Sequence, residues 1–516
     1  MSAADLSADL YALTASTVGL DPRPGLTHRD ADWAGLNVVV AGLGISGFAA
    51  TDALVERGAH VTVVDAGDGG SGVLFERSRI LEILGATLLT GAAGSAAISD
   101  PATVAGADLV VTSPGWRPDN PLLVAAARAG VPIWGEVELA WRMRPAQGAA
   151  PWLTITGTNG KTTTVTMAAS ILQAAGVRAA AAGNVGTPIL EAVLHPDPYE
   201  VIAVELSSFQ LHWQRSVSPL ASVCLNIAPD HVDWHGSLEA YAADKGRVYE
   251  NTRLACIYNE QDPATEQLVR DAEVVEGCRA VGFTLGVPGL SMLGLVDDVL
   301  ADRAFVDDRA NTAAEIGTLA DLQRGTHPPA PHFVANALAA AALTRAYGVA
   351  PIAVREGLRR YHVEKHRIAE VARVAGVTYV DDSKATNPHA ASASLAAFEN
   401  IVWIAGGLLK GAQVDELVAS RAERLRGVVL IGRDRAVIAQ ALARHAPDVP
   451  VVDVDAAAHD GDVMDAVVEA AARLAGDGDV VLLAPAAASM DMFTDYGARG
   501  EQFAAAVRRR AEAGES

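Results

Sequence analysis

At 516 residues the chain is too long for one hydrophobic core, and its length predicts about three domains. Half of the residues are hydrophobic and 20% are charged, a globular composition that excludes a largely disordered chain. The formal net charge of −22 argues against broad binding to nucleic acids or anionic membranes, because both carry negative charge.

The cysteines and the first residues point to a reducing compartment. Cys224, Cys256 and Cys278 lie far apart in the sequence without a metal-type spacing, so we expect reduced thiols. Residues 1–10 carry acids where a signal peptide has a basic segment, and no apolar run reaches the ~18 residues of a membrane span. We therefore expect a cytoplasmic protein without membrane insertion.

The first recognisable pattern follows an extension, residues 1–34, which contains a possible short helix near Leu6–Thr14 and to which we assign no function. A strand then runs into Gly42-Leu43-Gly44-Ile45-Ser46-Gly47, a helix follows, and a second strand ends at Asp65, 23 residues after Gly42. Strand, G-x-G-x-x-G, helix and strand-end acid are typical of a dinucleotide-binding fold. The pattern predicts nucleotide binding without distinguishing NAD from another nucleotide.

A third apolar segment ends at the turn Ser113-Pro114-Gly115. Ligand groups commonly lie at such strand ends in open α/β sheets, although a plain Pro-Gly turn has the same sequence. A Pro/Gln/Gly-containing linker, residues 144–151, separates this region from the next domain.

The stretch 152–164 carries the most specific pattern, a strand followed by Gly157-Thr158-Asn159-Gly160-Lys161-Thr162-Thr163 and a helix. In a phosphate-binding loop the glycines let backbone N–H groups approach phosphate oxygens, the lysine adds positive charge, and a Thr hydroxyl can ligate Mg²⁺. Only two residues separate the glycines, where the common loop has four. The sequence predicts use of a nucleoside triphosphate.

Further polar residues follow the next strands. Glu205 ends an apolar strand, where a second Mg²⁺ ligand or a helix-capping acid is expected. His231 follows another strand and is a candidate for a metal or substrate role, whereas we expect Asp233 and His235 to be polar loop residues. From spacing alone, Lys245 is an ordinary surface lysine on a helix.

The remainder predicts an insertion or a strand–loop region at 286–331, an Ala-rich helix from His332 to Tyr347, and alternating strands and helices from about Lys365 onwards. Strands that alternate with helices form mostly parallel, doubly wound sheets with ligand loops at their carboxyl ends. The fold class is therefore α/β, with three domains: a Rossmann-like domain, a central P-loop ATPase-type domain, and a second Rossmann-like domain.

The motifs together resemble the Mur ligases, ATP-dependent amide-forming enzymes of peptidoglycan synthesis. The resemblance covers residues 36 to 509 and rests on motifs in the family's order, namely Gly157–Thr163, Glu205–Gln210, Asp230-His231, Lys245, His332…Asn336, His366-Arg367 and Asp382–Asn387. It is closest to members that add D-glutamate to UDP-N-acetylmuramoyl-L-alanine, because of Gly42–Gly47 with Asp65, the Ser113–Gly115 turn and Ser489-Met490-Asp491. It implies domains at 35–147, 148–363 and 364–516, and a cytoplasmic enzyme that is a monomer.

The resemblance also implies the roles of individual residues. The UDP substrate would contact Gly44, Ile45, Ser46, Asp65, Ala66, Ser113, Pro114, Gly115, Asn184, Ser207 and Gln210. ATP would contact Gly157, Thr158, Asn159, Gly160, Lys161, Thr162, Thr163, Asn336, Arg367 and Asp382. D-glutamate would contact Lys384, Thr386, Lys410, Ser489, Met490 and Tyr496. Two Mg²⁺ ions would be held by Thr162, Glu205, His231 and Lys245, the last as a carbamate, and Lys161, His231 and Lys245 would be catalytic.

The chain departs from the family pattern at three of these places. Phe333 stands where the family has Asn, Ala66 replaces a hydroxyl residue, and Tyr496 replaces Phe. Two other functions fit less of the sequence. A folylpolyglutamate-type ligase lacks the domain that Gly42–Asp65 predicts, and an NAD-dependent oxidoreductase leaves Lys161, Glu205 and Asp382 unexplained.

Overall fold

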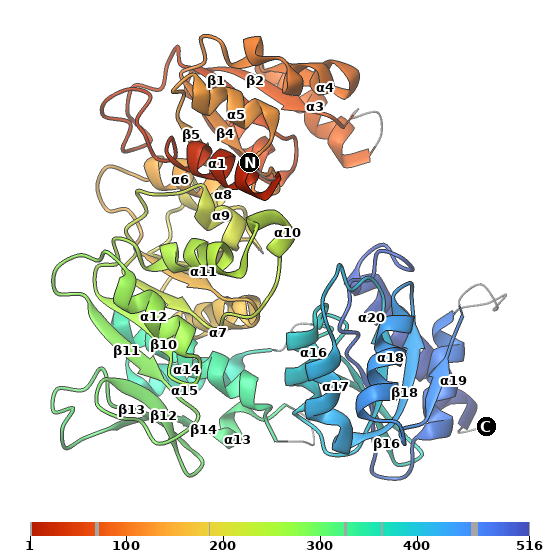
Figure 1. The fold of residues 1–516 in the computed structure, drawn as a ribbon. Helices are drawn as coiled ribbons and strands as arrows, with labels where there is room; N and C mark the ends of the chain where they lie inside the picture. The colour runs from red at the N-terminus through yellow and green to blue at the C-terminus, as the bar shows by residue number, and fades with distance from the viewer. Residues whose placement is uncertain are drawn as a thin grey trace. The chain divides into compact units, whose positions relative to one another are not determined.

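A computed structural model describes residues 3–67, 72–184, 186–324, 328–362, 365–455 and 463–514. The chain forms two compact units, Met1–Asp321 with Asn336–Tyr361, and Leu322–Ala335 with His362–Ser516. Three sheets of five, nine and six strands make up these units (Figure 1), the first two in the first unit and the third in the second. The predicted three-domain α/β architecture is confirmed.

The first sheet is parallel throughout, in the order β3-β2-β1-β4-β5. Its strands are β1 (Asn37–Ala41), β2 (His60–Asp65), β3 (Thr87–Thr90), β4 (Leu109–Thr112) and β5 (Ile133–Gly135). The connections contain α2 (Ile45–Glu56), α3 (Gly72–Leu84), α4 (Gly91–Ser99), η1 (Pro101–Val104) and α5 (Pro121–Arg128). The G-x-G-x-x-G segment joins β1 to α2, as predicted.

The second sheet has the order β14-β13-β12-β11-β10-β9-β6-β8-β7. Its parallel part contains β6 (Trp152–Thr156), β7 (Ala179–Gly183), β8 (Val201–Glu205), β9 (Ala221–Cys224), β10 (Ala255–Asn259) and β11 (Arg279–Phe283). The region expected to be an insertion or a strand–loop region adds β12 (Met292–Val296), which pairs parallel to β11, and the antiparallel β13 (Val299–Asp302) and β14 (Ala314–Thr318).

The helices of this part of the chain run along the connections between those strands. They are α6 (Glu136–Arg142), α7 (Lys161–Ala174), α8 (Ile189–Val193), α9 (Ser208–His212), α10 (Val232–His235), α11 (Leu238–Gly246), η2 (Arg247–Tyr249), α12 (Pro263–Asp271), α13 (Leu319–Leu322), α14 (Pro331–Tyr347) and α15 (Pro351–Arg360). The phosphate-loop segment joins β6 to α7, which confirms its predicted strand–loop–helix context.

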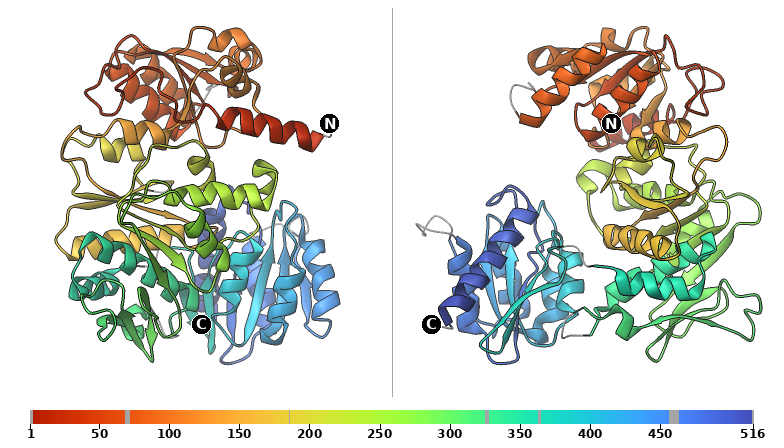
Figure 2. Two further views of the ribbon diagram at one scale, coloured as in Figure 1. Left: turned by 60° about the vertical axis from the view of Figure 1, so that its left-hand side comes forward. Right: turned by 180° about the vertical axis from the view of Figure 1, so that it is seen from behind.

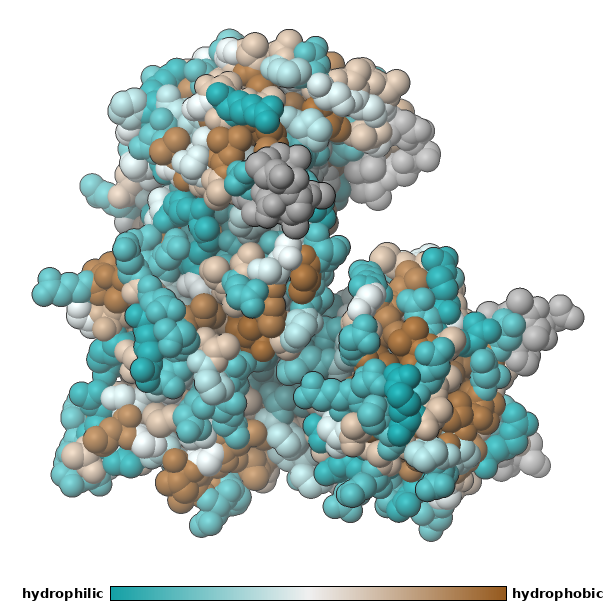
Figure 3. Space-filling model, viewed as in Figure 1, coloured by the Kyte–Doolittle hydropathy of each residue, from teal (hydrophilic) through white to brown (hydrophobic). Residues whose placement is uncertain are grey.

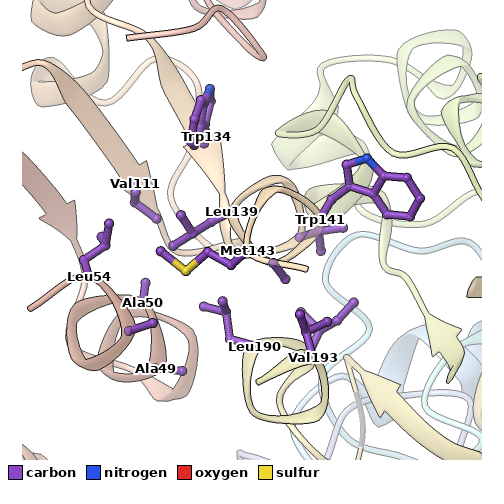
Figure 4. Close-up of a cluster of buried hydrophobic side chains, with 14 of the residues drawn as sticks. Ala49, Ala50, Leu54, Val111, Trp134, Leu139, Trp141, Met143, Leu190 and Val193 are labelled. Atoms are coloured by element: carbon purple, nitrogen blue, oxygen red, sulfur yellow. The ribbon is translucent and has the colours of Figure 1, made fainter. Parts of the chain in front are cut away.

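One hydrophobic core joins the first two sheets. Leu54 of α2, Leu139 of α6 and Leu190 of α8 belong to a single buried cluster that also contains Trp134 and Trp152. Figure 4 shows α2, α6 and α8 directing Ala50, Leu139 and Leu190 toward one another. Burial of this continuous apolar surface makes the first unit one packed body rather than two loosely linked domains.

The N-terminal extension forms α1 (Ala3–Ala15), which includes the predicted helix, and a loop that contacts the first sheet (Figure 2). Val18 bridges to Ile133 of β5, and the Trp134 indole donates to the Leu20 carbonyl at 2.9 Å. Arg142 donates to the Gly19 carbonyl at 2.9 Å. The extension is therefore fixed to the first unit by backbone and side-chain contacts.

The second unit contains a six-stranded sheet in the order β15-β16-β20-β17-β18-β19, with only β15 antiparallel to its neighbour. Its strands are β15 (Ala369–Val374), β16 (Val377–Asp381), β17 (Ile401–Gly406), β18 (Leu425–Ile431), β19 (Val451–Asp453) and β20 (Val480–Leu483). The helices are α16 (Pro388–Leu395), α17 (Asp415–Arg421), η3 (Ala422–Arg424), α18 (Arg435–His445), α19 (Val463–Leu474) and α20 (Tyr496–Gly514). Two buried clusters, one on each face, form its own core.

The visible face of each unit is mainly hydrophilic, with apolar residues in small separate patches (Figure 3). Among the described residues, no helix is both long and apolar enough to cross a membrane.

Candidate active site

The phosphate-loop segment lies at the carboxyl edge of the second sheet, where β6 is flanked by β8 and β9. Parallel strands bring their following loops to the same edge, so the segments after Thr156, Glu205 and Cys224 lie together. Gly157 has φ 151° and Gly160 has φ 86°, the second directly preceding α7. Both conformations favour glycine, and the loop delivers the N-terminus of α7 to the sheet edge.

The loop is held by residues that the sequence did not single out. Asn226, after β9, accepts from the Asn159 amide at 2.8 Å and donates to the Asn159 carbonyl at 3.1 Å. The Thr158 hydroxyl lies 3.0 Å from the Tyr241 hydroxyl and accepts from the Ala228 amide at 2.9 Å. The backbone of the loop is therefore preorganised by its neighbours rather than by its glycines alone.

The phosphate loop makes two further contacts, one with Asn336 and one with its own Lys161. A Cβ at Gly160 would stand 2.4 Å from the Asn336 side-chain oxygen, so Asn336, from α14, lies directly against the loop. Lys161 donates to the carbonyls of Gly157 and Thr158 at 2.8 and 2.9 Å. Thr162 and Thr163 are buried in the first turn of α7. All the residues predicted from the phosphate-loop pattern thus lie at one place, together with Asn336.

Lys245 is buried, with only 2% of it exposed, so the prediction of a surface lysine from spacing alone is wrong. Its amine donates to the Gly157 carbonyl at 2.9 Å and lies 4.8 Å from the centre of the Tyr241 ring. Burial, reinforced by the nearby charge of Lys161, lowers the pKa of Lys245 from 10.5 to about 7. A lysine at this depth carries a neutral amine in a large fraction of molecules near pH 7.

Glu205 is 1% exposed at the end of β8. One carboxylate oxygen accepts from the Asn184 amide at 3.0 Å, and the other, equally buried, has no hydrogen-bond partner among the described residues. A buried acid with a free oxygen is a costly arrangement unless it serves a ligand. This is the strongest local indication of a cation site.

The sequence predicted only part of the arrangement of the polar residues that follow β9. His231 is exposed, in a left-handed conformation with φ 50°, and its ring centre lies 4.8 Å from that of Phe209. Although the side chain is 44% exposed, partial desolvation of its ring lowers the pKa of His231, against the opposing charge of Asp230. We expected His235 to be a polar loop residue, and this prediction is wrong. It is buried, 4% exposed, at the end of α10, and its ring nitrogens lie within 3.0 Å of Asp244 and of Ser208. Asp233 is exposed, but it lies within α10 rather than in a loop.

Ser207 and Gln210 form a capping box at the start of α9. Gln210 donates its amide N–H to the Ser207 hydroxyl at 3.2 Å, and the Ser207 amide donates to the Gln210 side chain at 2.9 Å. Their spacing, Ser-x-x-Gln, is the sequence signature of this cap and could have indicated it. The structure gives both residues a local role at the helix end.

At the carboxyl edge of the first sheet, Asp65 organises the predicted nucleotide site. Its carboxylate accepts from the Leu43 amide and the Gly67 amide, each at 2.7 Å. A Cβ at Gly47 would stand 1.9 Å from the Gly42 carbonyl, so α2 can approach the loop only at glycine. The buried Ser113 hydroxyl has no hydrogen-bond partner among the described residues. Pro114 is half-buried, Ser46 likewise, and Gly44, Ile45, Ala66 and Gly115 are exposed.

In the second unit, the loops after β16, β20 and β17 leave the same edge because these strands are parallel neighbours. Asp382 is buried and accepts from the Ser394 hydroxyl and from the Ile368 amide. Its burial raises the pKa of Asp382 to about 6, an effect that the nearby charge of Arg367 opposes. Asp382 and Arg367 are therefore neighbours, as the resemblance implied.

The expected D-glutamate residues lie on these loops. The Lys384 amine is 3.8 Å from the centre of the Tyr496 ring, and the Thr386 amide donates to the Lys384 carbonyl at 2.8 Å. A bridge between Leu408 and Ala488 brings the turn of Lys410, which is exposed, beside that of Ser489. Ser489 is buried and Met490 is 63% exposed.

Arg499, which the sequence did not suggest, supports this arrangement. It is 1% exposed and donates to the Ser383 carbonyl at 2.8 Å and the Ala487 carbonyl at 3.1 Å. It thus fastens the loop after β16 to the loop after β20.

No group of three or more His, Cys, Asp or Glu side chains within the described ranges is arranged to hold a metal ion. The cysteines are free thiols, and Cys256 and Cys278, distant in sequence, have their sulfurs 3.7 Å apart.

Comparisons with known proteins agree with this architecture. The family model of the MurD-like N-terminal domain of Mur ligases matches residues 36–135, that of the Mur ligase middle domain 155–344, and that of the Mur ligase glutamate ligase domain 366–487. Two relatives are named UDP-N-acetylmuramoylalanine–D-glutamate ligase. The protein from Streptomyces avermitilis is 61% identical, covering 92% of this chain and 99% of its own, and that from Streptomyces coelicolor is 58% identical, covering 93% and 99%.

Solved structures support the fold alone, because their identities are low. A pseudomurein peptide ligase type C from Methanothermus fervidus is 16% identical, covering 92% of this chain and 100% of its own, with a TM-score of 0.53. A UDP-N-acetylmuramate-alanine ligase from Thermotoga maritima is 20% identical, covering 93% and 99%, with a TM-score of 0.51. From the identity of the relatives and the three successive domain matches, this chain belongs to the Mur ligase family.

Proposed function

We propose that the chain is an ATP-dependent ligase that adds D-glutamate to UDP-N-acetylmuramoyl-L-alanine, a step of peptidoglycan precursor synthesis. The observation that carries the proposal is the 61% identity, over 92% of the chain, with a relative named for this reaction. The phosphate loop at the edge of the second sheet supports ATP as the energy source.

The reaction follows from the weakness of a carboxylate as an acylating agent. ATP transfers its γ-phosphoryl group to the terminal carboxylate of the UDP substrate, which gives an acyl phosphate and ADP. The amine of D-glutamate then attacks the acyl carbon, phosphate leaves, and the amine loses a proton as the amide forms. Lys161 and the N-terminus of α7 would stabilise the negative charge on the transferring group.

The donor set fits Mg²⁺. The free oxygen of Glu205 and the Thr162 hydroxyl are oxygen donors of the kind that Mg²⁺ prefers, and His231 follows the adjacent strand. Lys245 would join them as a carbamate. Two bound Mg²⁺ ions would supply charge neutralisation at the phosphates.

Lys245 suits carbamate formation because its amine is buried and its pKa is lowered to about 7. The neutral amine nitrogen would bond to the carbon of CO₂ and release a proton, so that a side chain which is a cation when protonated becomes an anion with two oxygens. That change would convert a repulsive neighbour of a metal ion into a ligand.

The substrate contacts follow the three sheet edges. We infer that the UDP group binds at Gly44, Ile45, Ser46, Asp65, Ala66 and Ser113–Gly115, with Asn184, Ser207 and Gln210 toward its reactive end. ATP would also use Asn336, Arg367 and Asp382, and D-glutamate would use Lys384, Thr386, Lys410, Ser489, Met490 and Tyr496. We further infer domain boundaries at 35–147, 148–363 and 364–516, a monomer, and a cytoplasmic location.

The test is ADP release measured with each candidate amino acid. We expect turnover only when UDP-N-acetylmuramoyl-L-alanine and D-glutamate are both present, and none when L-lysine or diaminopimelate replaces D-glutamate. Equal turnover with those amino acids and none with D-glutamate would show that the substrate assignment is wrong. Lys161→Ala should abolish turnover, since it removes the loop's only full positive charge.

A further inference from the structure

Asp244 is a buried carboxylate on α11, one residue before Lys245, and only 1% of it is exposed. It accepts hydrogen bonds from four different elements. His212 of α9 and His235 of α10 each approach within 3.0 Å through Nδ1, Arg247 of η2 donates from 3.0 Å, and the Tyr11 hydroxyl of α1 donates as well. Although burial opposes ionisation, the histidine hydrogen bonds hold the pKa of Asp244 below its ordinary value.

Tyr11 brings the N-terminal extension into this network. Its ring centre is 4.4 Å from that of His212 and 6.3 Å from that of Trp234, so it packs as well as donates. The rest of the extension is anchored independently on the first sheet, through Val18, Gly19 and Leu20. Tyr11 is therefore one point at which a segment held by the first sheet contacts the second, and the Ala15 carbonyl, which accepts from Arg215 at 3.5 Å, is another.

The network touches the elements that carry the candidate active site. His235 ends the helix that begins after His231, and its Nε2 lies 3.0 Å from the Ser208 hydroxyl, three residues beyond Glu205. On α11, Asp244 is followed at once by Lys245, which donates to the Gly157 carbonyl of the phosphate loop. A shift of the Asp244 carboxylate would move α9, α10 and α11 relative to one another.

We propose that Tyr11 of the N-terminal helix is a positioning residue for Lys245, acting through its hydrogen bond to Asp244. The proposal rests on the proposed function, which gives Lys245 its chemical role. The Arg247 guanidinium and the hydrogen bonds from two histidines already stabilise the buried carboxylate, so the Tyr11 hydroxyl is not needed for that purpose. What it adds is a fixed direction for the carboxylate, set by a segment anchored on the first sheet.

The test compares Tyr11→Phe, which keeps the ring and removes the hydroxyl, with the full-length wild type. We expect kcat for ADP release to fall about tenfold, because small misplacements of reacting groups are costly. The KM values and the melting temperature should stay unchanged. Amide hydrogen exchange, followed by mass spectrometry, should become faster in residues 232–246. In an Asp244→Asn background, Tyr11→Phe should have little further effect on kcat, since the two groups act as one unit.

Tyr199→Phe is the matched control, because it removes a phenol hydroxyl from the same unit outside this network, and it should behave as wild type. Unchanged kcat in Tyr11→Phe overturns the proposal, as does a loss of activity that only follows a lower melting temperature. If the wild type itself fails to use D-glutamate, the proposed function fails. The hydrogen-exchange measurement then tests by itself whether Tyr11 positions residues 232–246. Faster exchange in Tyr11→Phe supports this role, and unchanged exchange overturns it.

Discussion

Three ionisable side chains at the candidate sites are buried: Glu205, Lys245 and Asp382. Burial disfavours the charged forms of Lys245 and Asp382, which lowers the pKa of Lys245 and raises the pKa of Asp382. An apolar residue at any of these positions would avoid that cost. Their presence at the carboxyl edges of sheets is what a binding or catalytic role predicts.

Substitution of Lys245 tests the role of its buried amine. Lys245→Ala should reduce ADP release at least about a hundredfold, since it removes the amine on which the proposed carbamate, and with it a proposed metal ligand, would form. Added bicarbonate should not restore activity, because alanine has no amine to react. Lys365→Ala is the control: it removes an exposed lysine whose amine pairs with Glu501 at 3.0 Å, and turnover should be unchanged. Wild-type activity in Lys245→Ala would remove the carbamate from the mechanism.

Asp382 gives a prediction about pH. Its pKa is about 6 in the folded chain against an ordinary 3.8, so between these pH values the folded state binds more protons than the unfolded state. The free energy of unfolding therefore falls as the pH rises through this window, by up to ~3 kcal/mol. Asp382→Asn removes the effect, because an amide keeps its partners without a charge.

We expect Asp382→Asn to melt higher than the wild type at pH 7.5 and at the same temperature below about pH 3, where the aspartate is protonated in both states. ADP release should decrease at the same time. Calorimetry at a series of pH values measures the first outcome. A constant difference in melting temperature across all pH values would contradict the assignment.

The contact between the phosphate loop and helix α14 can be tested by substituting Gly160, which precedes α7. Gly160→Ala places a methyl group 2.4 Å from the Asn336 oxygen at a φ of 86°. Gly148→Ala introduces the same methyl at a φ of 68° with no atom within 4 Å. Both substitutions carry the left-handed backbone penalty of about 1 kcal/mol, and only the first displaces a neighbour.

We therefore expect Gly160→Ala to raise the KM for ATP and lower kcat, and Gly148→Ala to leave both unchanged with a small loss of thermal stability. Steady-state kinetics with ATP as the varied substrate, alongside thermal melts, separates the two effects. Equal kinetics in the two variants would show that Asn336 does not constrain the loop.

The elements that the sequence predicted well are those whose pattern is local. The strand before Gly157, the helix after Lys161 and the acid that ends the second strand each follow from a periodic apolar run bounded by glycine. The Ser207–Gln210 cap has a local pattern too, and a search for it would have found it.

The contacts that were missed join residues far apart in the sequence. Tyr11, His212, His235 and Asp244 meet at one point, and Asn226 holds Asn159, yet no spacing rule connects them. The burial of Lys245 and the approach of Cys256 to Cys278 are of the same kind, since each depends on how strands and helices pack. Only the tertiary arrangement decides whether a polar residue faces water or a partner.

At the scale of the molecule, the number of sheets and the number of compact units differ. Three sheets predict three domains, but the first two share one core, in which Leu190 packs with Leu54 and Leu139. The second unit has separate cores on the two faces of its sheet. Cooperative unfolding follows shared cores rather than shared motifs.

This sharing predicts two calorimetric transitions for the full chain rather than three. Leu190→Ala, in the shared core, should cost about 2–5 kcal/mol and lower the transition of the first unit as a whole. Leu482→Ala, which is fully buried in the second unit, should lower the other transition by a similar free energy. Three resolved transitions, or a shift by Leu190→Ala of only part of the first-unit transition, would show that the first two sheets unfold independently. A single transition moved by both substitutions would instead mean that the two units unfold together, because their stabilities are coupled.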